Sequence, residues 1–298
     1  MSLATLRIRP VRETGGRWRT RAVTAVLLLP SSAWFFLLLI VPLGILLVFS
    51  VGERALEGGY AGGFTLENYT RLPTRFTAFF NTLWMALAGT VFCLVVGYPL
   101  AYYLATRAGP KKTLLLVLVI VPFWTSFLIR TYAWLTILGN TGIPTLLEGL
   151  GFDKPVLLNT PLAIVLGIVY NYLPLMVFPL FVALERLDKR LLEASKDLGA
   201  GRWATFRQVT LPLTLPGILS GVVLVFIPIM GEYLIPALLG GGKIYFVGNA
   251  LFDAFLQSRN WPLGSAMAVA LILVVLIAVS LYLWFGSRFG VRREVSLL

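Results

Sequence analysis

Long apolar runs separated by short polar segments dominate the sequence. Six of them reach the roughly 20 residues that a helix needs to cross the hydrocarbon core of a bilayer. They lie near residues 22–51, 77–105, 113–138, 161–184, 215–239 and 263–285. The pattern therefore predicts an all-α integral membrane protein with six transmembrane helices.

The first apolar run begins like a secretory signal peptide, with arginines before it and the small residues Ser31, Ser32 and Ala33 within it. It then stays apolar over residues 34–50, well beyond the apolar region of a signal peptide. We therefore expect an uncleaved first span, kinked at Pro42. This divides the chain into a basic N-terminal arm, residues 1–21, and one six-span membrane domain, residues 22–298.

Prolines interrupt two of the later runs, at Pro174, Pro179, Pro228 and Pro236. Each proline lacks a backbone N–H, and inside a bilayer neighbouring helices must satisfy the carbonyl group that this frees. Such interruptions favour a helix bundle around a pathway over a single membrane anchor.

A polar segment, EASKDLGAGRWATFRQVTLP at residues 193–212, lies between the fourth and fifth runs, and we call it the polar island. Just before and within it, small or apolar residues recur at helical spacing: Leu187, Leu191, Ala194, Ser195 and Leu198. This spacing predicts a short amphipathic helix. The two glycines that follow, Gly199 and Gly201, tolerate positive φ and can turn the chain into a second helix, which we expect Pro212 to close. Two helices with an apolar face beside a membrane are suited to docking into a groove of another protein.

Composition supports the membrane assignment. Hydrophobic residues make up 58% of the 298 residues and charged residues only 13%, against about a quarter in soluble domains. Basic residues in so apolar a chain mark the cytoplasmic ends of membrane helices rather than a nucleic-acid surface, although the net charge is +12. The absence of histidine excludes His-dependent metal sites and His general bases, and the single Cys93 is expected to pack as a small hydrophobic residue.

Lysine and arginine predict the orientation in the membrane. With the N-terminus in the cytoplasm, 18 of the 25 basic residues fall on the cytoplasmic side, in the arm, the loop after the second span, the loop at residues 185–212 that contains the polar island, and the C-terminal tail. Six fall outside, and Arg130 lies within a span. The bias places both termini and the polar island in the cytoplasm.

Two charged residues lie within the predicted spans. Counted along unbroken helices, Arg130 and Glu232 sit roughly 10–12 Å below the outer surface at 1.5 Å per residue. A charge at this depth costs at least about 2.5 kcal/mol unless it is paired or hydrated. Two structural explanations are open: the two residues form an ion pair, or the Arg130 side chain extends outward to the membrane surface. The functional alternative is that Glu232 lines a pathway. Aromatic side chains nearby could face a cation: Trp124, Tyr132, Trp134, Tyr170, Tyr172 and Tyr233.

No motif in the chain indicates catalysis or metal binding. Residues 240–243, Gly-Gly-Gly-Lys, have part of a phosphate-binding loop, but Ala237 stands at its first glycine position and Ile244 at its Ser/Thr position. We therefore expect no enzyme activity and no catalytic or metal-binding residues in this chain.

The spacing in the polar island is more specific than its amphipathic pattern. Glu193-Ala194-Ser195, Gly199 and the closing Val-Thr-Leu-Pro resemble the EAA loop of membrane subunits of bacterial ATP-binding-cassette importers. Ser195 and Val209 depart from the family's alanine and isoleucine, and both changes keep the size. In that family the loop is the coupling helix that receives the motion of the ATPase. The resemblance implies a coupling loop at residues 185–212, with these coupling residues: Glu193, Ala194, Ser195, Gly199, Arg202, Leu211 and Pro212.

Two further segments, residues 122–142 and 231–262, resemble permease subunits of spermidine/putrescine importers. The resemblance implies the type I importer (MetI-like) permease fold in a bacterial cytoplasmic membrane. It also implies a second, homologous permease, two cytoplasmic ATPase subunits that use the ATP, and a periplasmic or lipid-anchored solute-binding protein. The chain itself would bind no cofactor and no nucleic acid, only its cargo and membrane lipid. By this resemblance the expected cargo is a polyamine, spermidine or putrescine. The charges within the spans and their aromatic neighbours give the candidate pathway residues: Glu232, Tyr233, Arg130, Trp134 and Tyr172.

Other functions remain open at this point. Importer permeases resembling these segments carry other small solutes, such as amino-acid derivatives, opines, thiamine or ferric ion. An ion-coupled secondary transporter would also have six or more spans and charges at membrane depth, but it does not need the polar island and usually shows internal repeats. A channel is disfavoured by the lack of a filter segment.

Overall fold

The computed structural model describes residues 16–288 of the chain. It divides into two units, residues 1–48 and residues 49–298, and each is described by itself. Several basic residues of the predicted arm and tail lie outside the described residues: Arg7, Arg9, Arg12, Arg292 and Arg293.

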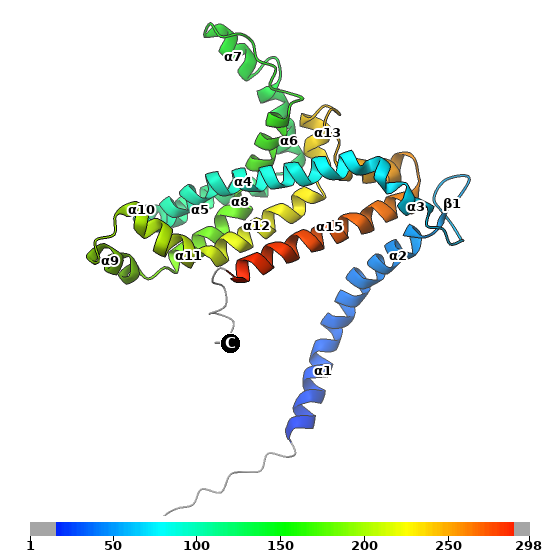
Figure 1. The fold of residues 1–298 in the computed structure, drawn as a ribbon, viewed down its shortest axis with the longest axis horizontal. Helices are drawn as coiled ribbons and strands as arrows, with labels where there is room; N and C mark the ends of the chain where they lie inside the picture. Colours follow the sequence, from blue (N-terminus) through cyan, green and yellow to red (C-terminus); the bar gives the residue numbers. More distant parts are fainter. Residues whose placement is uncertain (1–15, 289–298) are drawn as a thin grey trace, which may run out of the picture. The chain divides into compact units, whose positions relative to one another are not determined.

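The described part of the N-terminal unit is one long helix (Figure 1). It comprises α1 (Gly16–Phe35), the π-helical turn η1 (Phe36–Ile40) and α2 (Val41–Ser50), the last of which enters the second unit. The stretch Val23–Ser50 is long and apolar enough to cross a membrane. The helix already includes residues 16–21, the last six residues of the predicted arm. The π-turn lies directly before the Val41-Pro42 step, where the sequence predicted a kink.

Four long helices form the centre of the second unit: α4 (Phe76–Thr106), α8 (Pro161–Glu185), α12 (Leu215–Met230) and α15 (Trp261–Arg288). Small residues let α4 and α8 approach closely. A Cβ atom on Gly89 would lie 2.6 Å from Cγ2 of Ile168, and one on Gly97 would lie 3.1 Å from Cγ of Met176. Close approach at small residues is how helices gain packing energy in lipid, where burial of apolar surface contributes little.

Two of the six predicted spans are not single straight helices. The sequence indicated interruptions in the fifth, at Pro228 and Pro236, but none in the third. The third consists of η3 (Gly109–Lys111), α5 (Lys112–Ile120), η4 (Val121–Trp124), α6 (Phe127–Leu138) and α7 (Ile143–Gly149), and its two parts meet at 92°. Thr125 is extended at this break, next to a 3-10 turn that contains Pro122. The fifth ends at Met230, and α13 (Leu234–Leu239) begins after a break at residues 231–233.

In the described part of the chain, four helices are long and apolar enough to cross a membrane, or six if each bent pair counts as one span. The second bent pair joins Arg202–Leu213 to Leu215–Met230 at 64°. The six predicted spans therefore correspond to four continuous helices and two bent ones.

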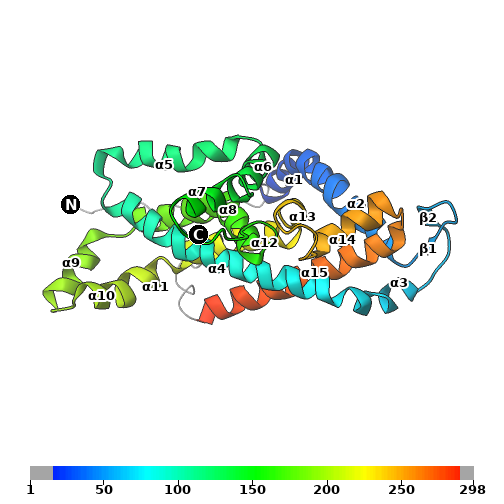
Figure 2. The same ribbon diagram turned by 90° about the horizontal axis from the view of Figure 1, so that it is seen from above.

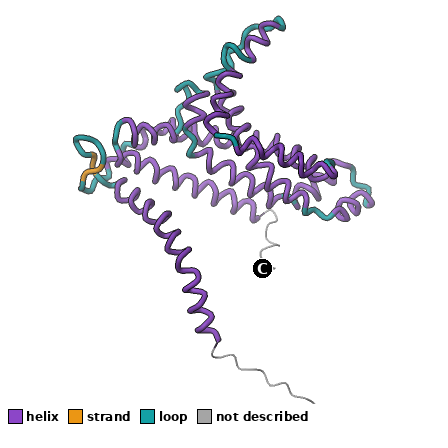
Figure 3. Tube along the Cα trace, turned by 180° about the vertical axis from the view of Figure 1, so that it is seen from behind, coloured by secondary structure: helices purple, strands orange, loops and turns teal. Residues whose placement is uncertain are grey.

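The two ends of the helices in the second unit differ. Figure 2 shows the helices of the polar island, α9 and α10, at one end, with α14 and the strands at the other. The described strands are β1 (Glu53–Arg54) and β2 (Tyr60–Ala61), which pair antiparallel and stand out in orange in Figure 3.

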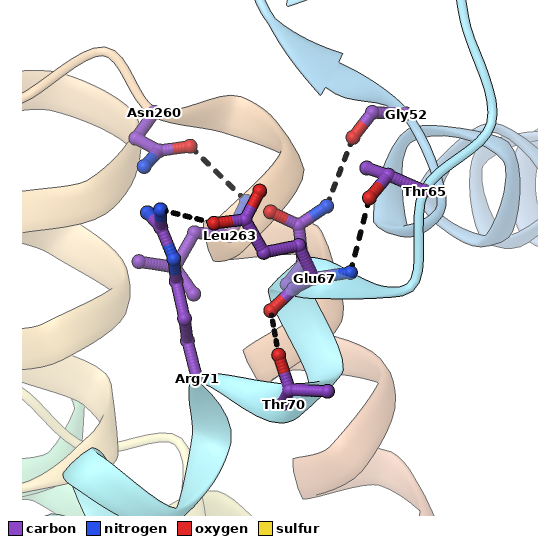
Figure 4. A network of polar contacts seen from close by, with 8 residues as sticks. Gly52, Thr65, Glu67, Thr70, Arg71, Asn260 and Leu263 are labelled. Atoms are coloured by element: carbon purple, nitrogen blue, oxygen red, sulfur yellow. Dashed lines mark hydrogen bonds and ion pairs between the residues drawn. The ribbon is translucent and has the colours of Figure 1, made fainter.

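Short helices and polar contacts close the end that carries the strands. They are α3 (Glu67–Thr70), η2 (Leu72–Arg75), α14 (Val247–Phe252) and η6 (Asp253–Gln257). Figure 4 shows α3, where Arg71 bonds the Glu67 carboxylate at 2.5 Å and Thr65 Oγ1 accepts the N–H of Glu67. Tyr245 donates its hydroxyl proton to Asp253; burial, and then this bond and the aspartate's charge, raise the pKa of Tyr245 to about 12.

Candidate functional site

The first helix of the polar island, α9 (Lys189–Asp197), forms where the sequence predicted an amphipathic helix. Asp188 caps it, because its Oδ1 accepts the N–H of Arg190 at 2.9 Å. None of its residues is buried. Its apolar side therefore lies open in this chain.

The turn after α9 is a Schellman motif with Gly199 in the left-handed region, at φ +81°. The N–H of Gly199 donates to the carbonyl of Lys196 at 2.8 Å, and the N–H of Ala200 donates to the carbonyl of Ser195 at 3.0 Å. This confirms the predicted glycine turn. The other glycine, Gly201, has φ −66° and ψ 167°, a conformation that any residue can adopt.

The second helix of the island runs through α10 (Arg202–Thr205), the π-helical turn η5 (Phe206–Thr210) and α11 (Leu211–Leu213). The prediction that Pro212 closes this helix was wrong, because the helix continues to Leu213 and bends at Thr214. Leu211 keeps α-helical angles although it precedes a proline, since its N–H bonds back to the carbonyl of Phe206 through the wider π-turn.

Most of the predicted coupling residues lie at the surface of the chain. Glu193, Ala194, Gly199, Arg202 and Pro212 are exposed, and Ser195 and Leu211 are half-buried. The departure at Ser195 has a structural role, because its hydroxyl lies 3.0 Å from that of Thr205 and joins α9 to α10.

Large apolar side chains stand beside these residues in solvent. Leu198 is 88% exposed and Trp203 is 73% exposed. An apolar surface on a pair of charged helices indicates an interaction site.

The second candidate region is a hollow of about 360 Å³ at the break between α12 and α13, which we call the Glu232 hollow. Two helices beside the break, α6 and α8, complete its wall. Its lining residues are Phe127, Tyr172, Pro228, Gly231, Glu232, Tyr233 and Leu234.

Glu232 is only 7% exposed, and both oxygens of its carboxylate accept hydrogen bonds from the protein. Oε1 accepts the N–H groups of Leu234 at 2.8 Å and Ile235 at 3.2 Å, so it caps the start of α13. Oε2 accepts the hydroxyl of Tyr172 at 2.5 Å. These three donors, together with the helix N-terminus, stabilise a negative charge at this position.

Arg130, also 7% exposed, makes different contacts. Its guanidinium carbon lies 5.3 Å from the ring centre of Phe123 and 5.8 Å from that of Phe127, which are cation–π distances. Its Nε has no hydrogen-bond partner, and no ion pair joins it to Glu232 among the described residues. The structure therefore contradicts the alternative of a structural Arg130–Glu232 ion pair.

The structure brings together three of the five predicted pathway residues, Tyr172, Glu232 and Tyr233, in the Glu232 hollow. Arg130 and Trp134 are not among its lining residues, and Trp134 instead packs edge-on against Tyr170, with ring centres 5.6 Å apart. The sequence analysis missed Phe127 and Pro228. The four-residue spacing from Pro228 to Glu232 is the sequence signal that could have found Pro228. The position of Phe127 depends on the break at Thr125, which only the structure shows.

A groove of about 570 Å³ lies along α8 and α12 next to the polar island. The residues that line it on α12 and α11 recur every three to four positions, counting back from Pro228 in the Glu232 hollow. The α12 and α11 residues that line it are Leu224, Ser220, Gly217, Pro216 and Leu213. Both hollows thus lie on the face between α8 and α12. Among the described residues, no group of three or more Cys, Asp or Glu side chains could hold a metal ion.

Comparisons with known proteins define the class. A family described as "Binding-protein-dependent transport system inner membrane component" matches residues 94–291. The chain is 41% identical over 270 residues to the spermidine/putrescine transport system permease protein PotB of Haemophilus influenzae, covering 89% of this chain and 94% of that protein. It is 44% identical over 239 residues to PotB of Escherichia coli K12, covering 78% and 86%.

The fold has a solved counterpart in the crystal structure of a bacterial ABC transporter involved in the import of the acidic polysaccharide alginate. The TM-score is 0.70 at 18% identity, over 91% of this chain and 96% of that one. The multi-pass, all-α permease fold of type I importers is thereby confirmed. The chain belongs to the family of inner membrane components of binding-protein-dependent transport systems, the permeases of ATP-binding-cassette importers. This family membership excludes the alternative functions of a secondary transporter and a channel.

Proposed function

We propose that this permease carries polyamines such as spermidine and putrescine, and that Glu232 faces the cargo on its way through the membrane. One observation carries the proposal: the Glu232 hollow presents a carboxylate between two tyrosines, Tyr172 and Tyr233, and a phenylalanine, Phe127. Carboxylates and aromatic faces are the groups that attract ammonium ions. The PotB relatives, named for the same cargo, support this choice of cation.

The face between α8 and α12 is the proposed wall of the pathway. It carries the Glu232 hollow toward one end and the groove beside the polar island toward the other. A second, homologous permease would close this face. The groove is lined mainly by apolar residues, which bind a polycation weakly and so allow its release.

The polar island is the proposed docking site for the ATPase. Its exposed Leu198 and Trp203 would enter a groove on one cytoplasmic ATPase subunit. The second permease would dock a second ATPase subunit in the same way. ATP is used by those subunits, and this chain binds no cofactor and catalyses no reaction. A periplasmic or lipid-anchored binding protein would deliver the cargo from the other side.

The proposed orientation has both termini and the polar island in the cytoplasm, as the basic residues indicate. A reporter fused after Leu298 should then be cytoplasmic, and one inserted near Gly151 should be exported. A reversed result at either site would overturn the orientation and the ATPase docking with it.

The transport proposal is tested with the full complex in liposomes, with the cognate binding protein outside and ATP inside. We expect uptake of labelled spermidine or putrescine that stops without ATP and persists when ion gradients are collapsed. Uptake of an amino-acid derivative, opine, thiamine or ferric ion in place of a polyamine would contradict the cargo but keep the importer. Uptake driven by an ion gradient without ATP would contradict both.

A further inference from the structure

The bend at Thr214 separates the polar island from α12. The helix of the island, Arg202–Leu213, meets α12 there at 64°. If the island moves, a soft bend would absorb the movement, whereas a fixed bend would pass it to α12. The contacts of Thr214 therefore decide how much of the movement reaches the membrane.

Thr214 is fully buried and its hydroxyl is held from two sides. Oγ1 donates to the carbonyl of Thr210 at 2.9 Å, and it lies 2.9 Å from the hydroxyl of Tyr98 on α4. A threonine hydroxyl has one proton, so when Thr214 gives it to Thr210 the Tyr98 hydroxyl must be the donor to Thr214. The bend is thus hydrogen-bonded to a helix 116 residues away in sequence.

Two aromatic ring contacts connect Tyr98 to the surface of the polar island. Trp203, which is exposed, stacks on Phe206 with ring centres 5.5 Å apart. Phe206 in turn meets the edge of Tyr98 at 5.7 Å and 86°. Tyr98 therefore contacts both the island helix and the bend, and it does so from α4, which packs along α8 and α12.

Both neighbouring helices are locally weakened beside these contacts. Pro99 removes one backbone hydrogen bond from α4 directly after Tyr98, and the π-turn η5 widens the island helix between Phe206 and Thr210. Backbone bonds alone would leave the region pliable. The side-chain contacts then fix the angle.

We propose that Tyr98 and Thr214 are positioning residues that hold the island helix at a fixed angle to α12, so that movement of the docked ATPase reaches the cargo pathway. This rests on the proposed function of the island. α12 has 16 residues, about 24 Å at 1.5 Å per residue, and the Glu232 hollow lies at its far end. A fixed angle lets α12 act as a lever between the island and the hollow.

The test is the number of cargo molecules transported per ATP hydrolysed by the purified complex in liposomes, with binding protein present. Tyr98→Phe removes only the hydroxyl and should lower this ratio about fivefold, the factor that one ordinary buried hydrogen bond provides. ATPase copurification and the amount of complex should stay normal. Tyr103→Phe is the matched control, since Tyr103 lies on the same helix, is 51% exposed and should leave the ratio unchanged.

A second variant tests the pair. Thr214→Val keeps the shape of the side chain and removes the hydroxyl that Tyr98 bonds. The double variant with Tyr98→Phe should transport no less cargo per ATP than Thr214→Val alone. An unchanged ratio in Tyr98→Phe overturns the proposal, as does a lower yield of complex at an unchanged ratio, which would mean a structural role. Independent, multiplicative losses in the double variant overturn it too. Failure of the wild-type chain to bind an ATPase would instead refute the proposed function.

Discussion

The polar island and the Glu232 hollow are built in opposite ways. In the island, neighbours in sequence make the contacts: Asp188 caps α9 and Gly199 closes it, within a few residues of one another. In the hollow, Tyr172 meets Glu232 from 60 residues away, and Phe127 comes from yet another helix. The island leaves its apolar side chains in solvent, whereas the hollow buries its charge.

This difference follows from what each region binds. A docking surface must be complete before its partner arrives, so local capping and exposed apolar residues are enough. A charge at membrane depth must be stabilised by donors, and a helix break supplies them, because the N-terminus of α13 offers free N–H groups. The four predictions below test this contrast.

The largest effect is expected from Glu232→Gln. The change keeps the shape of the side chain and removes its charge, so polyamine uptake should fall roughly ten- to hundredfold, as for loss of a charged hydrogen bond. Uptake by the reconstituted complex measures this. Glu148→Gln, at an exposed residue paired with Lys154, is the control and should transport normally. Normal uptake by a well-assembled Glu232→Gln permease would remove Glu232 from the pathway.

Gly199→Ala should act on the island alone. A Cβ atom at φ +81° costs about 1–2 kcal/mol, so ATPase association should weaken roughly tenfold while membrane insertion is unaffected. Gly201→Ala is a matched control, because both glycines have open space around them and Gly201 has an ordinary φ. Copurification of the ATPase measures the effect. Equal losses in the two variants would show that the left-handed backbone conformation of Gly199 is not the cause.

Arg130 and Glu232 should behave independently. Arg130 contacts Phe123 and Phe127 and forms no ion pair with Glu232 in this structure. Thermal unfolding of Arg130→Gln, Glu232→Gln and the double variant should therefore give a coupling energy below about 0.5 kcal/mol. Recovery of stability in the double variant would show that the two charges pair after all.

The smallest effect is expected from Ser195→Ala, which restores the alanine typical of the family. It removes the bond to Thr205 between two partly solvated hydroxyls and should cost about 0.5–1 kcal/mol. Faster hydrogen exchange in α9 would reveal this, with transport nearly unchanged. A Thr205→Val change made in the Ser195→Ala background should add little to the exchange rate, and a large further increase would show that the two hydroxyls do not act together.

The sequence by itself determined the membrane class, the six apolar runs and the island with its glycine turn. These features depend on composition, on helical period and on the one residue type that adopts positive φ freely, so nearby residues suffice to predict them. The family resemblance also came from residues close together in the chain, and the comparisons confirmed it.

Only the tertiary structure decided where the helices break and what the two buried charges contact. The predicted apolar runs continue across Thr125 and across Gly231, so an apolar run by itself does not show that its helix bends by 92° or restarts with a carboxylate cap. The pairing of Tyr172 with Glu232, and of Tyr98 with Thr214, depends on which helices lie side by side. A buried polar group needs a partner, and that requirement can be read from the sequence, but the partner is chosen by the packing of distant helices.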